Sequence, residues 1–399
     1  MVKLIHTSDW HLGKKLHRFS RRDDQIAAMN FFLKVVKDEN IKVFIIAGDL
    51  FDQFRPDYVA LNDLLSFLKQ LIELNCYPVL ITGNHDSIHL LGALNSYLKK
   101  DQITIFHDLI SENEKIIQIN NKRILFKGLP YFRENQLHEY YLKNTITKEV
   151  QCEAESTAIP DVEELLIQYS KIKCPEEYDY SIFIGHHLFS RFELSGSEDS
   201  VFLSGIDSIN FKSLGQFDYF AFGHIHKYQK LEENAFYSGS PIPINFGEPQ
   251  QKYYNIIQAS EKNGCLQIVK CDLPQFRPLF YIKAQSDKIL KKIESIPKVS
   301  IGNLEGIAEI MVTLKEPDPT LQDQIKAALL KKNIQVINYI PYLESDESFY
   351  SQAEFERIYS LNIDSLFQEY FLSKYPEINE VPTKYLQKFQ DLKQGLDEV

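Results

Sequence analysis

The sequence is poor in cysteine and tryptophan, with five of the former and one of the latter among 399 residues. The cysteines are scattered, their number is odd, and no two of them form a CxxC pair. This pattern indicates neither a disulfide framework nor a zinc ribbon, and it is typical of the reducing cytoplasm. We therefore expect a cytoplasmic protein that is held together by its apolar core.

Long apolar runs are missing too. None reaches the ~18 residues that a membrane-spanning helix needs, and the apolar start of the chain breaks at once into His6-Thr7-Ser8-Asp9. We expect neither a signal peptide nor a membrane span. A G-x-x-x-x-G-K-[ST] motif is also missing, so any dependence on ATP would have to come from another chain.

Positive charge is scarce, because 44 Lys and Arg face 55 Asp and Glu and the net charge is −11. On its face this balance argues against a nucleic-acid partner. The acidity is uneven, however: residues 344–399 carry 12 acidic and 5 basic side chains, so −7 of the total lies there. The rest of the chain is nearly neutral, and bound divalent cations would add positive charge where phosphates bind.

The chain does contain apolar strands that end in polar residues. Residues 43–47 form an apolar run that predicts a fully buried strand, and Gly48-Asp49 follow it. A βαβαβ order around this strand predicts an α/β fold with parallel pairing and helices on both faces. The other members of this unit are strands at 2–6 and 77–82 and helices at 21–37 and 57–74.

The length suits one large domain and one or two small ones. Residues 274–278 contain two prolines and are the best linker candidate. The pattern after them alternates strand and helix, which predicts a small α+β domain, and from about residue 350 it is helical. We predict domains at residues 1–273, 274–343 and 350–399.

Five strand ends carry polar clusters of one chemical character. A lone histidine on a strand is more often a core group than a ligand, but five such clusters in register point to a shared site at one edge of the sheet. Mixed carboxylate, imidazole and amide ligands suit Mn²⁺, with Fe²⁺ and Zn²⁺ as alternatives. The candidate ligands are too many for one ion, and Asp49 is the natural bridge between two ions ~3.5–4 Å apart. The clusters are Asp9-x-His11, Gly48-Asp49, Gly83-Asn84-His85-Asp86, Gly185-His186-His187 and Gly223-His224-x-His226.

The order D-x-H, G-D-x-x-D, G-N-H-D, H, G-H-x-H resembles the pattern of the calcineurin-like metallophosphoesterases and covers roughly residues 4–226. Residues 6–13, 47–52 and 237–243, with Phe246 and Glu248, resemble more narrowly the SbcD-type nucleases of double-strand-break repair. The resemblance implies a two-sheet sandwich flanked by helices, a small α+β capping domain and a helical C-terminal tail.

The resemblance also implies roles for the clustered residues. His85 would not bind metal but would face the scissile phosphate, as a charge stabiliser or general acid, and Asp86 would hold the His85 ring. Whether Asp52 and His187 take part in the site stays open. His186 is taken as the match of the fourth block, because it follows Gly185 directly. One implied metal site is Asp9, His11, Asp49 and His226, and the other is Asp49, Asn84, His186 and His224.

The implied activity is that of a two-metal DNA nuclease, with Mn²⁺ as the expected metal. It would be a 3′→5′ double-strand exonuclease and a single-strand and hairpin endonuclease, acting with an SbcC-type coiled-coil ATPase in DNA repair, recombination and replication. The tail would bind the ATPase, the region 274–343 would cap the DNA, and the helix at 57–74 with the one from Ile88 would join two copies in a homodimer.

Two alternatives remain. The same metals would serve a small-molecule phosphodiesterase or nucleotidase, although a small substrate needs neither the extra domain nor the tail. A scaffold protein without chemistry is the other alternative, and the complete ligand set argues against it.

Overall fold

The computed structural model describes residues 2–98, 103–146, 161–189, 193, 208–259, 265–300, 304–316 and 318–343, and isolated positions between 367 and 389. The chain divides into two units: residues 1–311 with 320–340, and residues 312–319 with 341–399. The boundary that the sequence predicts at residue 274 stays a prediction. Among the described residues, no helix has the length and apolar character to cross a membrane.

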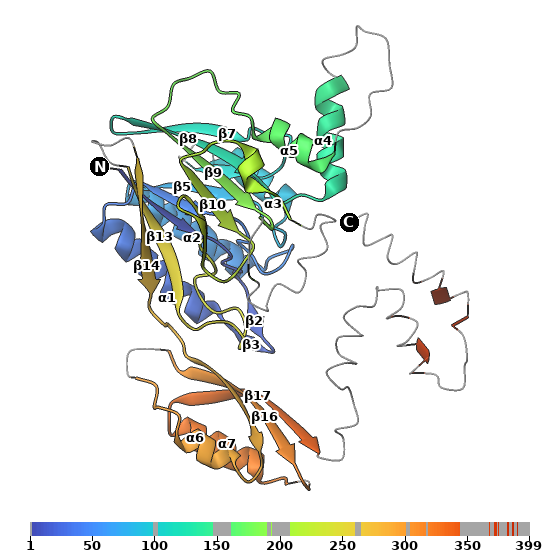
Figure 1. Cartoon of the computed structure of the whole chain (residues 1–399). Coiled ribbons are helices and arrows are strands. Elements are labelled where there is room, and N and C mark those ends of the chain that lie inside the picture. Colours follow the sequence, from blue (N-terminus) through green and yellow to red (C-terminus); the bar gives the residue numbers. More distant parts are fainter. Residues whose placement is uncertain are drawn as a thin grey trace. The chain divides into compact units, whose positions relative to one another are not determined.

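Two six-stranded sheets form the body of the first unit (Figure 1). In the first sheet, four parallel strands are extended by an antiparallel pair, in the order β14-β13-β1-β4-β5-β6. The strands are β1 (Val2–Thr7), β4 (Val43–Ile46), β5 (Tyr77–Ile81), β6 (Thr104–Phe106), β13 (Lys252–Ala259) and β14 (Leu266–Leu273).

The second sheet has the order β11-β12-β10-β9-β8-β7, with parallel strands inside and an antiparallel strand at each edge. Its strands are β7 (Glu114–Ile119), β8 (Lys122–Leu129), β9 (Tyr180–His186), β10 (Tyr219–Gly223), β11 (Gln229–Glu232) and β12 (Ala235–Tyr237). The expected two-sheet α/β sandwich is confirmed.

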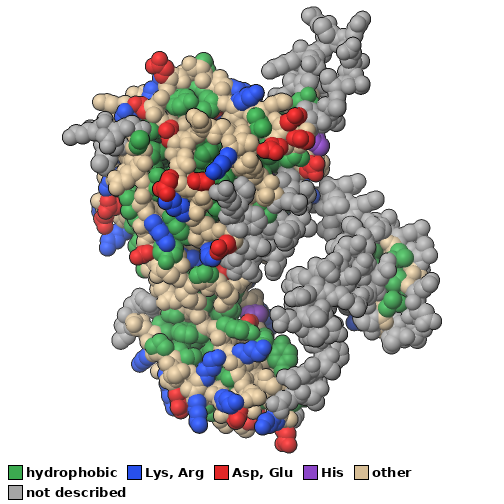
Figure 2. Space-filling view, viewed as in Figure 1, with side chains coloured by type: hydrophobic (Ala, Val, Ile, Leu, Met, Phe, Trp, Pro, Cys, Tyr) green, Lys and Arg blue, Asp and Glu red, His purple; other side chains and the backbone are tan. Residues whose placement is uncertain are grey.

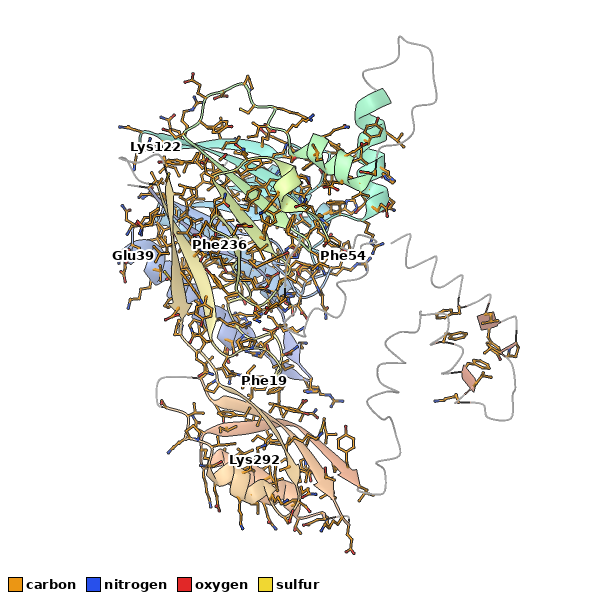
Figure 3. All side chains as sticks on the ribbon, viewed as in Figure 1. Phe19, Glu39, Phe54, Lys122, Phe236 and Lys292 are labelled. Atoms are coloured by element: carbon orange, nitrogen blue, oxygen red, sulfur yellow. The ribbon has the colours of Figure 1, made fainter. Side chains whose placement is uncertain are left out.

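Alternation along the buried strands divides the core into layers. In β4, Val43 and Ile45 face the second sheet, while Phe44 and Ile46 face the helices that cover the first. Phe236, labelled in Figure 3, belongs to the layer between the sheets. Because both faces of these strands are buried, the sequence shows continuous apolar runs rather than alternation with polar residues.

Helices cover the outer faces of both sheets. On the first sheet lie α1 (Arg22–Asp38), α2 (Tyr58–Glu73) and α3 (Ile88–Leu98), and the second carries α4 (Glu134–Ile146) and α5 (Val162–Ser170) with the 3₁₀ turn Phe211–Leu214. Asp57 caps α2, because its Oδ1 accepts from the Ala60 N–H at 2.7 Å. A short hairpin, β2 (Lys15–Leu16) and β3 (Phe19–Ser20), precedes α1.

The predicted small α+β arrangement follows residue 278. It is a three-stranded sheet in the order β15-β16-β17, accompanied by two helices that contact each other. These elements are β15 (Leu279–Gln285), α6 (Ile289–Glu294), β16 (Gly306–Leu314), α7 (Leu321–Leu330) and β17 (Ile334–Leu343). At its start, buried Arg277 donates from Nε to Asp24 Oδ2 of α1 at 2.8 Å.

Most of the tail lies outside the described residues. Where it is described, Phe367 stacks on Phe389 with ring centroids 4.1 Å apart, and Phe371 contacts Phe367 and Tyr385. The tail aromatics therefore pack on one another.

Candidate metal centre

The sequence pattern suggested that the five polar clusters lie at one edge of a single sheet. In the structure they come from two sheets. Those of Asp9, Asp49 and Asn84 follow β1, β4 and β5 of the first sheet, whereas His186 ends β9 and His224 follows β10 of the second. The clusters nevertheless converge, because the carboxyl ends of both sets of parallel strands meet at one end of the sandwich.

Glycine allows the two sheets to approach this closely. A Cβ on Gly223 of the second sheet would lie 1.9 Å from the carbonyl oxygen of Ala47 in the first. A Cβ on Gly48 would lie 2.1 Å from Nδ1 of His186, and Gly48 also has a φ of +88°. Larger residues at these positions would push the sheets apart, so the glycines set the width of the seam between the two sheets.

The backbone is strained where it presents the polar side chains. Asp9, His11, Asp49 and His224 all have positive φ, between 45° and 97°. Residues other than glycine adopt this region at a cost, and such strain clusters at functional sites. The strain is sustained by buried hydrogen bonds across the seam, such as the one from the His224 N–H to Asp9 Oδ1 at 2.9 Å.

Asp49 lies at the middle of the cluster. Its Oδ2 is 3.5 Å from Nε2 of His11 and 3.4 Å from Nε2 of His186. Its Oδ1 accepts from the His85 N–H at 2.9 Å, which fixes the carboxylate. One oxygen atom thus stands between an imidazole of the first sheet and an imidazole of the second, the position required of a bridging ligand.

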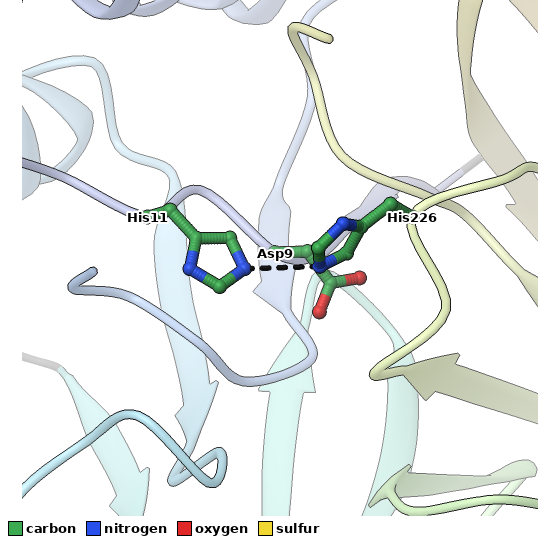
Figure 4. Close-up of side chains that lie close together, drawn as sticks. All are labelled: Asp9, His11 and His226. Atoms are coloured by element: carbon green, nitrogen blue, oxygen red, sulfur yellow. Dashed lines mark hydrogen bonds between the residues drawn. The ribbon is translucent and has the colours of Figure 1, made fainter. Parts of the chain in front are cut away.

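On one side of Asp49, Nε2 of His11 lies 3.1 Å from Nε2 of His226, with the Asp9 carboxylate beside them (Figure 4). Two adjacent ligands of an ion at about 2.1 Å subtend roughly this separation. On the other side, Asn84 Oδ1 lies 3.1 Å from Nε2 of His186 and 2.9 Å from Nδ1 of His224. The donor atoms therefore converge in two groups that fit divalent cations.

The protonation states of two imidazoles suit metal binding directly. Burial lowers the pKa of His224 to about 3 and that of His11 well below its usual value, so both rings are neutral at pH 7 with a free lone pair. Burial works against a charge on His186, but Asp49 and Asp9 raise its pKa to about 9. Burial also opposes the charge of Asp49, and His186 and His85 still hold the Asp49 pKa well below its usual range. At pH 7 His186 therefore carries a proton beside Asp49, and a metal ion that binds this ring would displace that proton.

The ring-holding role expected of Asp86 is wrong. Its carboxylate accepts instead from three backbone N–H groups, those of Leu50 and Phe51 at 3.1 and 3.0 Å and of Gly83 at 2.9 Å. The His85 ring is held by the carbonyl oxygen of Asp52, 2.9 Å from Nδ1. Asp86 therefore joins the loops after β4 and β5, and a main-chain oxygen orients His85.

His85 lies close to the cluster, since its ring centroid is 4.9 Å from that of His11 and its donor atoms are within reach of those of His11 and Asp49. The geometry permits it as a ligand, so its expected role as a non-ligand stays a prediction.

Two residues left open by the sequence support the site. Asp52 pairs with Lys14 at 2.9 Å and lies 3.7 Å from Nδ1 of His11. His187 accepts from the Phe132 N–H at 3.2 Å and stacks on Tyr131, with ring centroids 5.0 Å apart. Sequence reasoning missed Tyr131 and Phe132, because they follow β8 without any motif.

Trp10, which lies between Asp9 and His11 in the sequence, has a packing role. It is buried among the rings of Phe32, Phe44 and Phe67. The loop that carries Asp9 and His11 is thereby anchored in the core under the first sheet.

Comparison with known proteins assigns the family. The model of the calcineurin-like phosphoesterase family matches residues 2–228, more than half of the chain. The chain belongs to this family. The family is one of phosphoesterases, and the carboxylates and imidazoles of this chain converge as ligands of divalent metals do. Together these findings identify a metal-dependent phosphoesterase with a divalent-metal centre. A solved structure of a hypothetical protein from Thermus thermophilus is 12% identical and covers 68% of this chain and 99% of its own, with a TM-score of 0.35, a likeness too weak to inform on function.

Proposed function

We propose that this phosphoesterase is a two-metal DNA nuclease, a 3′→5′ double-strand exonuclease and a single-strand and hairpin endonuclease. The observation that carries the two-metal part is the position of Asp49 Oδ2, 3.5 and 3.4 Å from imidazoles of the two sheets. Two-metal sites with a bridging carboxylate are well suited to displacement at phosphorus.

The proposed ligands fall into two sets that share Asp49, and the proposed metal is Mn²⁺. This ion accepts the mixture of oxygen and imidazole donors that the two groups offer. One set is Asp9, His11, Asp49 and His226, and the other is Asp49, Asn84, His186 and His224.

When bound, the metal ions supply an activated water and neutralise charge on the phosphate. The residues of the chain do the rest. The strained loops hold the donor atoms in place, so little reorganisation is needed during the reaction. With Nδ1 engaged by the Asp52 carbonyl oxygen, His85 presents Nε2 as the remaining nitrogen, which would stabilise the phosphate or protonate the leaving oxygen.

Lysines of the small α+β region support a polymeric substrate. The surface of α6, α7 and their flanks carries several exposed lysines, interspersed with acidic side chains (Figure 2), and their ammonium groups would meet a phosphate backbone. Such contacts carry no base identity, so we expect weak sequence preference. The lysines are Lys283, Lys288, Lys291, Lys292 and Lys331.

We further propose two partners. The tail, residues 350–399, would bind a coiled-coil ATPase of the SbcC type, since the chain has no G-x-x-x-x-G-K-[ST] motif of its own. A second copy of the chain would pack on α2 and α3, where Tyr58 and Tyr97 are 90% and 80% exposed.

The test compares substrates in Mn²⁺ with the purified chain: an end-labelled hairpin DNA, an end-labelled duplex, bis-p-nitrophenyl phosphate and a cyclic nucleotide. The proposal expects cleavage of the hairpin and shortening of the duplex from its 3′ ends. Turnover of the cyclic nucleotide with intact DNA would favour the small-molecule alternative instead.

A further inference from the structure

Glu248 lies in the loop between β12 and β13, and its carboxylate is buried at the edge of the metal centre. Oε1 accepts from Nδ1 of His226 at 3.0 Å. Oε2 accepts from Nζ of Lys252 at 2.6 Å and from the Ile244 N–H at 3.1 Å. Each carboxylate oxygen therefore has a fixed donor, and the group cannot turn without losing one.

This contact determines which nitrogen of His226 carries a proton. A carboxylate only accepts, so Nδ1 must be the donor, and the neutral ring then keeps its lone pair on Nε2. Nε2 is the atom that points at His11, 3.1 Å from the Nε2 of that ring. The carboxylate thus aims the free lone pair of His226 into the metal group of Asp9 and His11.

The other described imidazoles of the centre are oriented differently. His186 and His85 direct Nδ1 at the main-chain oxygens of Ala47 and Asp52, at 2.7 and 2.9 Å. Nδ1 of His11 is 3.7 Å from the Asp52 carboxylate, beyond hydrogen-bond distance. Among the Nδ1 atoms of these rings, a hydrogen bond to a carboxylate is found at His226, and such a partner raises the basicity of a ligating imidazole.

Lys252 completes the arrangement from β13. Its buried ammonium donates to Glu248, to Ser240 Oγ at 2.9 Å and to the carbonyl oxygen of His226 at 3.1 Å. It therefore holds both the carboxylate and the main chain of the histidine that the carboxylate orients. His226, Glu248 and Lys252 are thus joined by hydrogen bonds beside one of the two proposed metal sites.

We infer that Glu248 is a positioning residue of this metal centre. It sets the tautomer of His226 and thereby strengthens binding of the ion held by Asp9, His11 and His226. The inference rests on the metal centre and not on the proposed DNA substrate. A chain that binds metal in this way but does not cut DNA would refute the proposed substrate and leave the role of Glu248 intact.

The test uses Glu248→Gln in the full chain. In this variant Lys252 and Ile244 attract the amide oxygen, so the amide NH₂ faces Nδ1 of His226. The ring must then accept at Nδ1 and carry its proton on Nε2, where the metal would bind. We expect Mn²⁺ titration by calorimetry to show one of the two ions weakened about 10- to 100-fold, the usual effect of losing such a partner, with the other ion retained.

A matched control is Glu114→Gln. Glu114 also pairs with a buried lysine, Lys127 at 2.9 Å, and also accepts from backbone N–H groups, but its contacts are with Lys173 and Cys174 rather than the metal centre. This variant loses a comparable ion pair and should keep both Mn²⁺ affinities. Thermal unfolding of both variants in chelator separates loss of fold from loss of metal.

A direct readout does not need the variant to fold. Nitrogen-15 NMR of the histidine rings in the chelated wild-type chain should show His226 protonated on Nδ1. A proton on Nε2, or unchanged Mn²⁺ affinity in a folded Glu248→Gln chain, would overturn the inference.

Discussion

The two sheets contribute unlike chemistry to the metal centre. The first supplies both carboxylates, Asp9 and Asp49, together with the Asn84 amide and His11. The second supplies imidazoles, those of His186, His224 and His226. Neither sheet alone offers a complete set of donors to either proposed ion, so the centre exists because the seam between the sheets is narrow.

The difference also shows in how the donors are supported. Loops of the first sheet are tied by hydrogen bonds within that sheet, as where Asp86 joins the loops after β4 and β5. Residues of the second sheet make hydrogen bonds to the first. His186 Nδ1 bonds to the Ala47 carbonyl oxygen, and the His224 N–H donates to the Asp9 carboxylate. The loops of the first sheet are thus held within that sheet, whereas donors of the second are held by contacts with the first.

The largest expected effect comes from the residue that both groups share. Asp49→Asn removes the charge between His11 and His186, so binding of both ions and all phosphodiester cleavage should fall below detection. Metal content by mass spectrometry and bis-p-nitrophenyl phosphate turnover measure this. The control is Asp63→Asn, a buried carboxylate paired with Arg22. Retention of both ions by the Asp49 variant would refute the bridging role.

His85→Gln should have the next largest effect. Its main-chain N–H still holds Asp49, but glutamine cannot transfer a proton, so turnover should fall about 10²- to 10⁴-fold. Metal content should stay at the wild-type level. Loss of metal in this variant would instead make His85 a ligand, as its proximity to His11 and Asp49 allows.

Gly223→Ala tests the seam itself. The new methyl group would meet the Ala47 carbonyl oxygen at 1.9 Å, and main-chain atoms must shift. Overpacking of this kind costs about 1–3 kcal/mol of unfolding free energy, which denaturant unfolding measures. The shift should also weaken Mn²⁺ binding, because it displaces the ligands that come from the second sheet. Gly247→Ala is the control, since Gly247 itself is exposed and the atom nearest to its new methyl group would be Asn245 Oδ1 at 3.3 Å. Equal stability of the two variants would show that the seam is not tight.

The smallest effect on cleavage is expected from deleting residues 350–399, because none of the proposed metal ligands lies among them. Manganese-dependent hydrolysis of bis-p-nitrophenyl phosphate should be unchanged, while capture of an SbcC-type ATPase should be lost. Retained capture would contradict the proposed role of the tail, and lost hydrolysis would show that the tail supports the sandwich.

Motif order was enough to place the residues that meet at the seam. The apolar runs before Asp49 and His224 predicted buried strands, and strand ends put their polar residues at one end of the fold. Support of the ligands could not be read in this way. Glu248 lies 22 residues after His226 and Asp86 lies 36 residues after Leu50, and such hydrogen bonds leave no periodic signal. The role of Asp86 was therefore predicted wrongly, and Glu248 was noticed only as part of a motif.

The glycines show the same limit. At Gly48 the reason for glycine is local, because the positive φ there makes a sharp turn at the end of β4. At Gly223 the reason is different, because the atom that excludes a side chain belongs to the other sheet. Contacts between elements so far apart in the sequence depend on sheet packing, which local patterns do not encode.

The place of β13 has a consequence for synthesis on the ribosome. Strand β1 lies inside the first sheet, and its partner on one side is β13, residues Lys252–Ala259. Until that segment has emerged, a nascent chain that has completed β1, β4 and β5 presents an apolar strand with unpaired main-chain groups, which invites pairing with other chains. A chain truncated before residue 252 should therefore expose this edge of β1 and aggregate more readily than the full chain.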